Sequence, residues 1–204
     1  MKIILSESQY QRLIETEKEQ KVLEIPSLSY FGKDRLEAWN NLQIFLEKKD
    51  NPPYSIGGDL DLSELPIESL GNLISVDGNL DLYNTQIKSL GKLKSVGGHL
   101  ILRNTLIDSV GELTSVGGDL NLGGLPITSL ANLKSVGQGL VLSNSLIKSL
   151  GNLKSVGGDL YLTRTPIQSL GNLKFVGGDL YLRGTPISQS PITGVKIGGG
   201  ILRG

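Results

Sequence analysis

Residues 75–94, SVDGNLDLYNTQIKSLGKLK, are followed directly by residues 95–114, SVGGHLILRNTLIDSVGELT, and the two stretches align over their whole length without a gap. The same twenty-residue unit begins at Ser55 and repeats until Ile187, which gives about seven units. Repetition at a fixed period of this length is typical of a solenoid, in which each unit forms one coil and packs only against its neighbours. We therefore expect one continuous solenoid.

The apolar positions of one unit do not have the spacing of a helix or of a long strand. In the second unit they are Val76, Leu80, Leu82, Ile87, Leu90 and Leu93. A Leu-x-Leu pair has the two-residue period of a short strand with both leucines inward, and the Gly-Gly pair before it is typical of a corner. The sequence thus predicts a mainly β fold, a single-chain parallel β solenoid about 34 Å long with extended or 3₁₀ segments on its other sides.

The pattern Leu-x-Leu-x-x-(Asn/Thr)-x-Ile-x-x-Leu resembles the leucine-rich repeat. The longer pattern Ser-Leu-x-Asn-Leu-x-Ser-Val-Gly-Gly-x-Leu is similar to receptor L-domain-like repeats and their bacterial and phage relatives. This resemblance covers about two thirds of the chain, and it implies a recognition scaffold without naming a target. One position departs from the family: its ladder asparagine is replaced by Leu65, Thr85, Thr105, Leu125, Ser145, Thr165 and Thr185. A polar ladder at that corner is therefore expected to be only partial.

The region before the repeats has a different composition. Residues 1–54 hold 17 of the chain's 40 charged residues. From Asp34 to Lys49 apolar residues recur at helical spacing, and Asn51-Pro-Pro ends that helix. They are Leu36, Trp39, Leu42, Phe45 and Leu46. We expect this helix to cover the open hydrophobic end of the first coil; the alternative is that it docks onto a partner. Residues 1–54 are thus assigned as anchor and cap, and residues 55–204 as the solenoid.

A second helical segment is expected at the start of the chain. Ser6 followed by Gln9 resembles a capping box, and Tyr10, Leu13 and Ile14 then form a short apolar face. The opening MKIILSESQYQRLI resembles the openings of uncharacterised tailed-phage proteins. Joined by a linker at residues 25–28, this segment would anchor the protein in a larger assembly, with its three apolar residues as docking candidates.

At the other end, the repeat pattern stops after Ile187 and returns only partly at residues 197–201. Pro191 and the glycines Gly198, Gly199 and Gly200 interrupt the ladder there, and proline with glycine is a common protection of an open sheet edge. The alternative is end-to-end stacking with a second chain, so self-association stays open.

Charge and composition exclude several classes of partner. Lysine plus arginine and aspartate plus glutamate number twenty each, so neither nucleic acid nor an anionic membrane is expected to bind. The apolar start before Ser6 is too short for a signal peptide, and no stretch has the apolar length of a membrane span. We expect a cytoplasmic or virion-associated protein with a protein partner.

The sequence offers no set of catalytic or metal-binding residues. It has no cysteine and one histidine, His99, which excludes cysteine nucleophiles and multi-histidine metal sites. His99 is interpreted as a surface substitution. The Gly-Gly pairs recur once per coil and are interpreted as corners, not as a phosphate-binding loop. We expect no enzyme activity, no cofactor and no metal.

A solenoid places equivalent positions of successive coils in a line, and the outward strand positions change from acidic to aromatic along it. Tyrosine and arginine are enriched at interaction hot spots, so Tyr161, Tyr181 and Arg183 are the strongest partner-binding candidates. The same two columns add four further candidates: Tyr83, Arg103, Asp61 and Asp81.

Two polar columns are expected to stabilise corners. One contains Asp59, Asp119, Asp159 and Asp179, whose side chains are predicted to bond back across the Gly-Gly turn, with a calcium site as the alternative. The other is a serine column, predicted to form hydrogen bonds within its own corner. It comprises Ser69, Ser89, Ser109, Ser129, Ser149 and Ser169.

Two functions follow as hypotheses. In the first, the chain is a non-catalytic interaction or structural protein, a phage-encoded virion or assembly component, with the solenoid as a rigid scaffold and the N-terminal segment as an anchor. In the second, it is a recognition module that binds or inhibits a host protein or a carbohydrate through the strand face.

Overall fold

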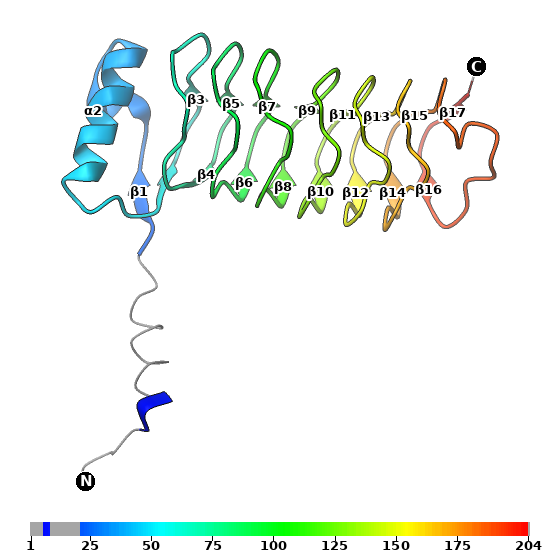
Figure 1. Cartoon of the computed structure of the whole chain (residues 1–204), viewed down its shortest axis with the longest axis horizontal. Helices are drawn as coiled ribbons and strands as arrows, with labels where there is room; N and C mark the ends of the chain where they lie inside the picture. The colour runs from blue at the N-terminus through cyan, green and yellow to red at the C-terminus, as the bar shows by residue number, and fades with distance from the viewer. Residues whose placement is uncertain (1–5, 9–20, 204) are drawn as a thin grey trace.

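The computed structural model describes residues 6–8 and 21–203, and residues 21–203 form a β solenoid in which the coils are stacked in a row (Figure 1). Most coils contribute two short parallel strands, one to each of two sheets. Sheet A contains β1 (Leu23–Ile25), β2 (Tyr54–Ile56), β4 (Leu73–Val76), β6 (Ser95–Val96), β8 (Ser115–Val116), β10 (Ser135–Val136), β12 (Ser155–Val156), β14 (Phe175–Val176) and β16 (Lys196–Ile197). Sheet B contains β3 (Leu60–Asp61), β5 (Leu80–Asp81), β7 (Leu100–Ile101), β9 (Leu120–Asn121), β11 (Leu140–Val141), β13 (Leu160–Tyr161), β15 (Leu180–Tyr181) and β17 (Ile201–Leu202).

The predicted parallel solenoid and its twenty-residue period are confirmed. From β4 to β14 each strand of sheet A pairs with the strand one unit later, as Val136 does with Val156. Sheet B follows the leucine pair, as predicted. Sheet A was not predicted, because a single inward valine per coil leaves no alternation that could identify a strand.

The register changes at both ends of the stack. At the C-terminal end Phe175 pairs with Lys196, one residue more than the repeat period, so the chain closes a further irregular coil with β16 and β17. Both strands lie at the partial return of the pattern at residues 197–201, and the coil is irregular, as the sequence indicates. In this coil Arg203 donates hydrogen bonds to the backbone carbonyls of Ser188 and Ser190.

At the N-terminal end, β1 pairs with β2 and so extends sheet A by one strand. Ile25 is buried in this strand and Leu28 is buried in the 3₁₀ helix η1 (Leu28–Phe31), so the linker expected at residues 25–28 is wrong. The docking candidates Tyr10, Leu13 and Ile14 lie outside the described residues.

The helix α2 (Arg35–Glu47) lies at the N-terminal end of the row of coils (Figure 1). The Asp34 side chain caps it by accepting a hydrogen bond from the Glu37 N–H. Its buried residues are Ala38, Trp39, Leu42 and Leu46, all part of the same hydrophobic core as the coils. The predicted α-helical cap is therefore confirmed. Leu36, expected on the covering face, is 37% exposed. No helix of the described part of the chain is long and apolar enough to cross a membrane.

The core is one continuous column of aliphatic side chains that runs the length of the stack. Leu140, Leu142, Ile147, Leu150 and Leu153 of one middle coil have no exposed surface at all. Close stacking explains the repeated glycines: a Cβ atom at Gly157 would lie 2.0 Å from the Gly137 carbonyl oxygen of the preceding coil. Gly157 does not have a left-handed φ, so glycine is needed there for proximity.

The serine and threonine columns stabilise the remaining corners. The predicted role of the serine column is confirmed, since Ser89 Oγ accepts a hydrogen bond from Gly91 N at 3.0 Å and each of the other serines bonds in the same way. In the column that departs from the leucine-rich repeat, Thr85 donates its hydroxyl to the Leu82 carbonyl at 2.8 Å. The buried Ser145 hydroxyl has no partner in the described part of the chain, so this ladder is partial, as predicted.

Candidate interaction surface on sheet B

All seven partner-binding candidates predicted from the sequence lie on or beside the outer face of sheet B. They fall into two groups that are several coils apart. Asp61, Asp81, Tyr83 and Arg103 belong to the coils next to α2, and Tyr161, Tyr181 and Arg183 belong to the coils near the C-terminal end.

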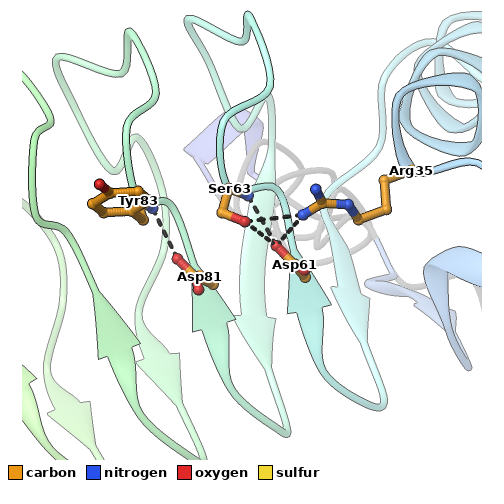
Figure 2. A network of polar contacts seen from close by, with 5 residues as sticks. All are labelled: Arg35, Asp61, Ser63, Asp81 and Tyr83. Carbon is orange, nitrogen blue, oxygen red and sulfur yellow. Dashed lines mark hydrogen bonds and ion pairs between the residues drawn. The ribbon is translucent and has the colours of Figure 1, made fainter.

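In the first group, Asp61 connects the cap to the first coil. Arg35 of α2 donates a hydrogen bond to Asp61 Oδ1 at 2.5 Å and another to Ser63 Oγ at 2.9 Å (Figure 2). The backbone N–H and hydroxyl of Ser63 also donate to Asp61 Oδ1. Partial burial opposes ionisation, but the hydrogen bonds from Ser63 and the charge of Arg35 outweigh it and lower the pKa of Asp61. This carboxylate is occupied within the chain.

Asp81 has a similar local role one coil later. Its Oδ1 accepts a hydrogen bond from the backbone N–H of Tyr83 at 2.8 Å, which stabilises the turn after β5 (Figure 2). Asn121 makes the same bond to the Gly123 N–H at 3.0 Å. Acidic and amide side chains in this outward column therefore support their own turns, a role that the sequence analysis did not assign to them.

In the second group, the rings of Tyr161 and Tyr181 are stacked, with centroids 4.3 Å apart and planes inclined by 13°. The Tyr161 hydroxyl donates to Asp159 Oδ2 at 3.0 Å, and the Tyr181 hydroxyl donates to Asp179 Oδ2 at 3.4 Å. The bond to Asp159 is the main reason that the pKa of Tyr161 is raised to about 12. Both rings are thus held in one orientation while remaining half-exposed.

The aspartates that hold these tyrosines belong to a ladder between coils. Asp159 Oδ1 accepts a hydrogen bond from the backbone N–H of Asp179, the equivalent residue of the next coil, at 2.7 Å. Asp59, Asn79, His99, Asp119 and Asp179 accept an N–H from the following coil in the same way. We call this row the inter-coil ladder. The predicted bond back across the Gly-Gly turn is wrong, because these side chains bond to the backbone of the neighbouring coil instead.

His99 is a member of this ladder and not a mere surface substitution. Its Nδ1 accepts the backbone N–H of Asp119 at 2.9 Å. Asp119 Oδ2 lies 3.2 Å from the same nitrogen.

The inter-coil ladder is interrupted at Gly139. Without a side chain there, the backbone N–H of Asp159 has no acceptor among the described residues. A cavity of about 550 Å³ opens at this point. We call it the Gly139 notch; it is lined by Asp119, Leu120, Asn121, Gln138, Gly139, Val141, Gly158, Asp159 and Tyr161. The Gly139 notch was not predicted from the sequence. The sequence does mark its place, because residues 137–139 read Gly-Gln-Gly where the equivalent residues of the neighbouring coils read Gly-Gly-Asp.

A second groove of about 540 Å³ runs along sheet A over the Ser-Val-Gly columns and ends at Phe175. Its wall is nearly uniform from coil to coil, and it gathers no charged cluster. Among the described residues, no group of three or more histidine, cysteine or acidic side chains is placed to hold a metal ion.

The chain matches no protein-family model, no curated protein and no solved structure.

Proposed function

We propose that this protein is a non-catalytic recognition scaffold that binds a protein partner through the C-terminal part of the outer face of sheet B. The observation that carries the proposal is the stacked pair of Tyr161 and Tyr181. Each ring is oriented by an aspartate that is itself fixed in the inter-coil ladder. Rigid, half-exposed tyrosines contribute a large contact area at little entropic cost on binding.

Arg183 adds a cation beside the tyrosines. It is exposed, and within the described residues its side chain makes no hydrogen bond or ion pair. An arginine without an internal partner can pair with a carboxylate of another protein without first breaking a bond of its own. The N-terminal group of candidates lacks this property at Asp61 and Asp81, whose carboxylates already accept hydrogen bonds from the chain.

The test begins with capture of partners on the immobilised full chain, followed by measurement of affinity with each purified partner. The triple variant Tyr161→Ala, Tyr181→Ala, Arg183→Ala should weaken binding by at least about a hundredfold, since hot-spot residues each contribute about 2 kcal/mol or more. The matched control is Tyr83→Ala, Arg103→Ala on the other half of the same face. Equal affinities of the triple variant and the unaltered chain would contradict the proposal.

The leucine-rich-repeat type of the solenoid and its setting in a phage particle are finer parts of this proposal. The first is supported by the Leu-x-Leu and Asn/Thr-x-Ile pattern, the second by the opening MKIILSESQYQRLI alone. If the N-terminal segment is an anchor, removing residues 1–20 should abolish assembly while β1 and the solenoid stay folded. Assembly that survives this truncation would remove the anchor from the proposal and leave the recognition face in place.

A further inference from the structure

The break in the inter-coil ladder is not required by the fold. Gly139 does not have a left-handed φ, and a Cβ atom there would meet only Asp119 Oδ1 at 3.1 Å and the Asp159 carbonyl oxygen at 3.7 Å. The equivalent position of the preceding coil holds Asp119, whose side chain is accommodated. A side chain would therefore fit at residue 139 with little adjustment. Because residue 139 has no side chain, one hydrogen bond of the inter-coil ladder is missing next to the tyrosine pair.

The shape of the Gly139 notch suits one planar group. Val141 pairs with Asn121 on one side and with Tyr161 on the other, and its side chain has no ring. The stack of rings therefore ends at Tyr161, and the space over the Val141 side chain is open. Two coil spacings separate the levels of Tyr161 and Asn121, which is about 10 Å. Tyr181 covers one face of the Tyr161 ring. A planar group above Val141 would cover the other face and continue the stack.

The charge of the Gly139 notch suits a cation that donates hydrogen bonds. Its lining includes the carboxylates of Asp119 and Asp159 and no lysine or arginine. Asp119 Oδ1 accepts the Gly139 N–H, whereas Asp119 Oδ2 lies 3.2 Å from His99 Nδ1, itself an acceptor, and the Asp119 side chain is 55% exposed. An anion would be repelled here, whereas a cation is attracted to the two carboxylates.

We propose that the Gly139 notch receives the guanidinium group of an arginine side chain of the protein partner, stacked on the free face of Tyr161 and donating to Asp119 Oδ2. This inference rests on the proposed recognition function and names the chemistry of the partner. A guanidinium is planar, permanently charged and able to stack on an aromatic face while its edge donates hydrogen bonds to a carboxylate. A lysine ammonium carries the same charge but is not planar.

The first test needs no partner. The full chain is titrated with blocked arginine, and the ring resonances of Tyr161 are followed by NMR beside titrations with blocked lysine, blocked tyrosine and a methyl glycoside. Saturable binding of blocked arginine, with a Kd on the order of millimolar and at least about tenfold tighter than that of blocked lysine, is the expected result. Equal binding of the two cations, preference for the tyrosine or the sugar, or no binding at all would overturn the inference.

The second test fills the notch. In Gly139→Asn the new side chain restores the missing rung and occupies the cavity, so binding of blocked arginine should fall at least about tenfold. The matched control is Gly124→Asn, which should leave that binding unchanged. Gly124 has a φ of 74°, no atom lies within 4 Å of the position that a Cβ atom would take there, and Asn occupies the same left-handed position in three other coils. Unchanged binding by folded Gly139→Asn would overturn the inference.

The two proposals fail in different ways. If the partner binds the unaltered chain and Gly139→Asn equally, but not the triple alanine variant, the arginine site is wrong and the recognition face stands. If the triple variant still binds the partner, the recognition face itself is wrong, whatever blocked arginine does.

Discussion

The two halves of the outer face of sheet B have the same backbone and different uses of their side chains. Near α2, outward polar groups are bonded within the chain, as Asp61 is to Arg35 and Asp81 is to the Tyr83 N–H. Near the C-terminal end, Tyr161 and Tyr181 bond through their hydroxyls and stack on each other, yet both rings stay half-exposed. Arg183 has no internal partner among the described residues. A regular scaffold thus supports its own turns on one half and leaves a contact surface on the other.

This difference teaches that the repeat alone does not determine function. The inward columns are nearly identical in every coil because each coil must pack against the next. The outward columns are free to vary, and their variation separates the two halves. Changes to the inward stacking should therefore affect both halves equally, whereas changes to outward residues should affect stability in one half and binding in the other.

The largest effect is expected from the stacking glycines. In Gly97→Ala and Gly157→Ala the added Cβ would lie 2.0 Å from a carbonyl oxygen of the preceding coil, so the backbone must shift. Each variant should lower the free energy of unfolding by about 2 to 3 kcal/mol, measured by urea denaturation. Gly58→Ala is the control, since its Cβ would come no closer than 3.7 Å to any atom. A large difference between the first two variants would show that the halves do not share one stacking geometry.

A smaller effect is expected at Asp61. Asp61→Ala removes the acceptor of hydrogen bonds from Arg35 and Ser63, and it should lower the free energy of unfolding by about 1 to 2 kcal/mol. Arg183→Ala should change that free energy by less than about 0.5 kcal/mol and weaken partner binding instead. If Arg183 proved to be needed for stability and Asp61 for binding, the proposed difference between the two halves of the face would be wrong.

The ion pair between Asp61 and Arg35 should also make the free energy of unfolding depend on pH. The pKa of Asp61 is lowered in the folded chain, so the stabilisation is present above the unfolded pKa and is lost as the pH falls through the folded pKa. We expect the free energy of unfolding to fall in the acid range by up to about 1 kcal/mol from this group, because the pair is partly exposed. Asp61→Asn should show a weaker fall when both proteins are unfolded in urea across that range. Identical pH profiles would mean that Arg35 does not stabilise the ionised form.

Much of this arrangement was predictable from the residues and some of it was not. The period, the inward leucines and the capping helix with Trp39 were predicted because burial imposes a pattern on the sequence. The hydrogen bonds of Asp61 and Asp159 were not, because they join residues twenty or more positions apart whose spacing is fixed only by the stack. His99 was misjudged for the same reason: a lone histidine gives no sign that its acceptor nitrogen matches an amide of the next coil.

The smallest effect, and the one that joins the two halves, is expected from Gly139→Asn. The Asn79 side chain already accepts the N–H of His99 at 2.7 Å in the equivalent position, so an asparagine at residue 139 should accept the unpaired N–H of Asp159. The restored bond and the reduced freedom of the unfolded chain should raise the free energy of unfolding by about 0.5 to 1 kcal/mol. Urea denaturation beside Gly124→Asn would measure it. Destabilisation would show that the contact with Asp119 is too close for a side chain, and that the gap in the ladder is a packing requirement instead of a surface feature kept open for a partner.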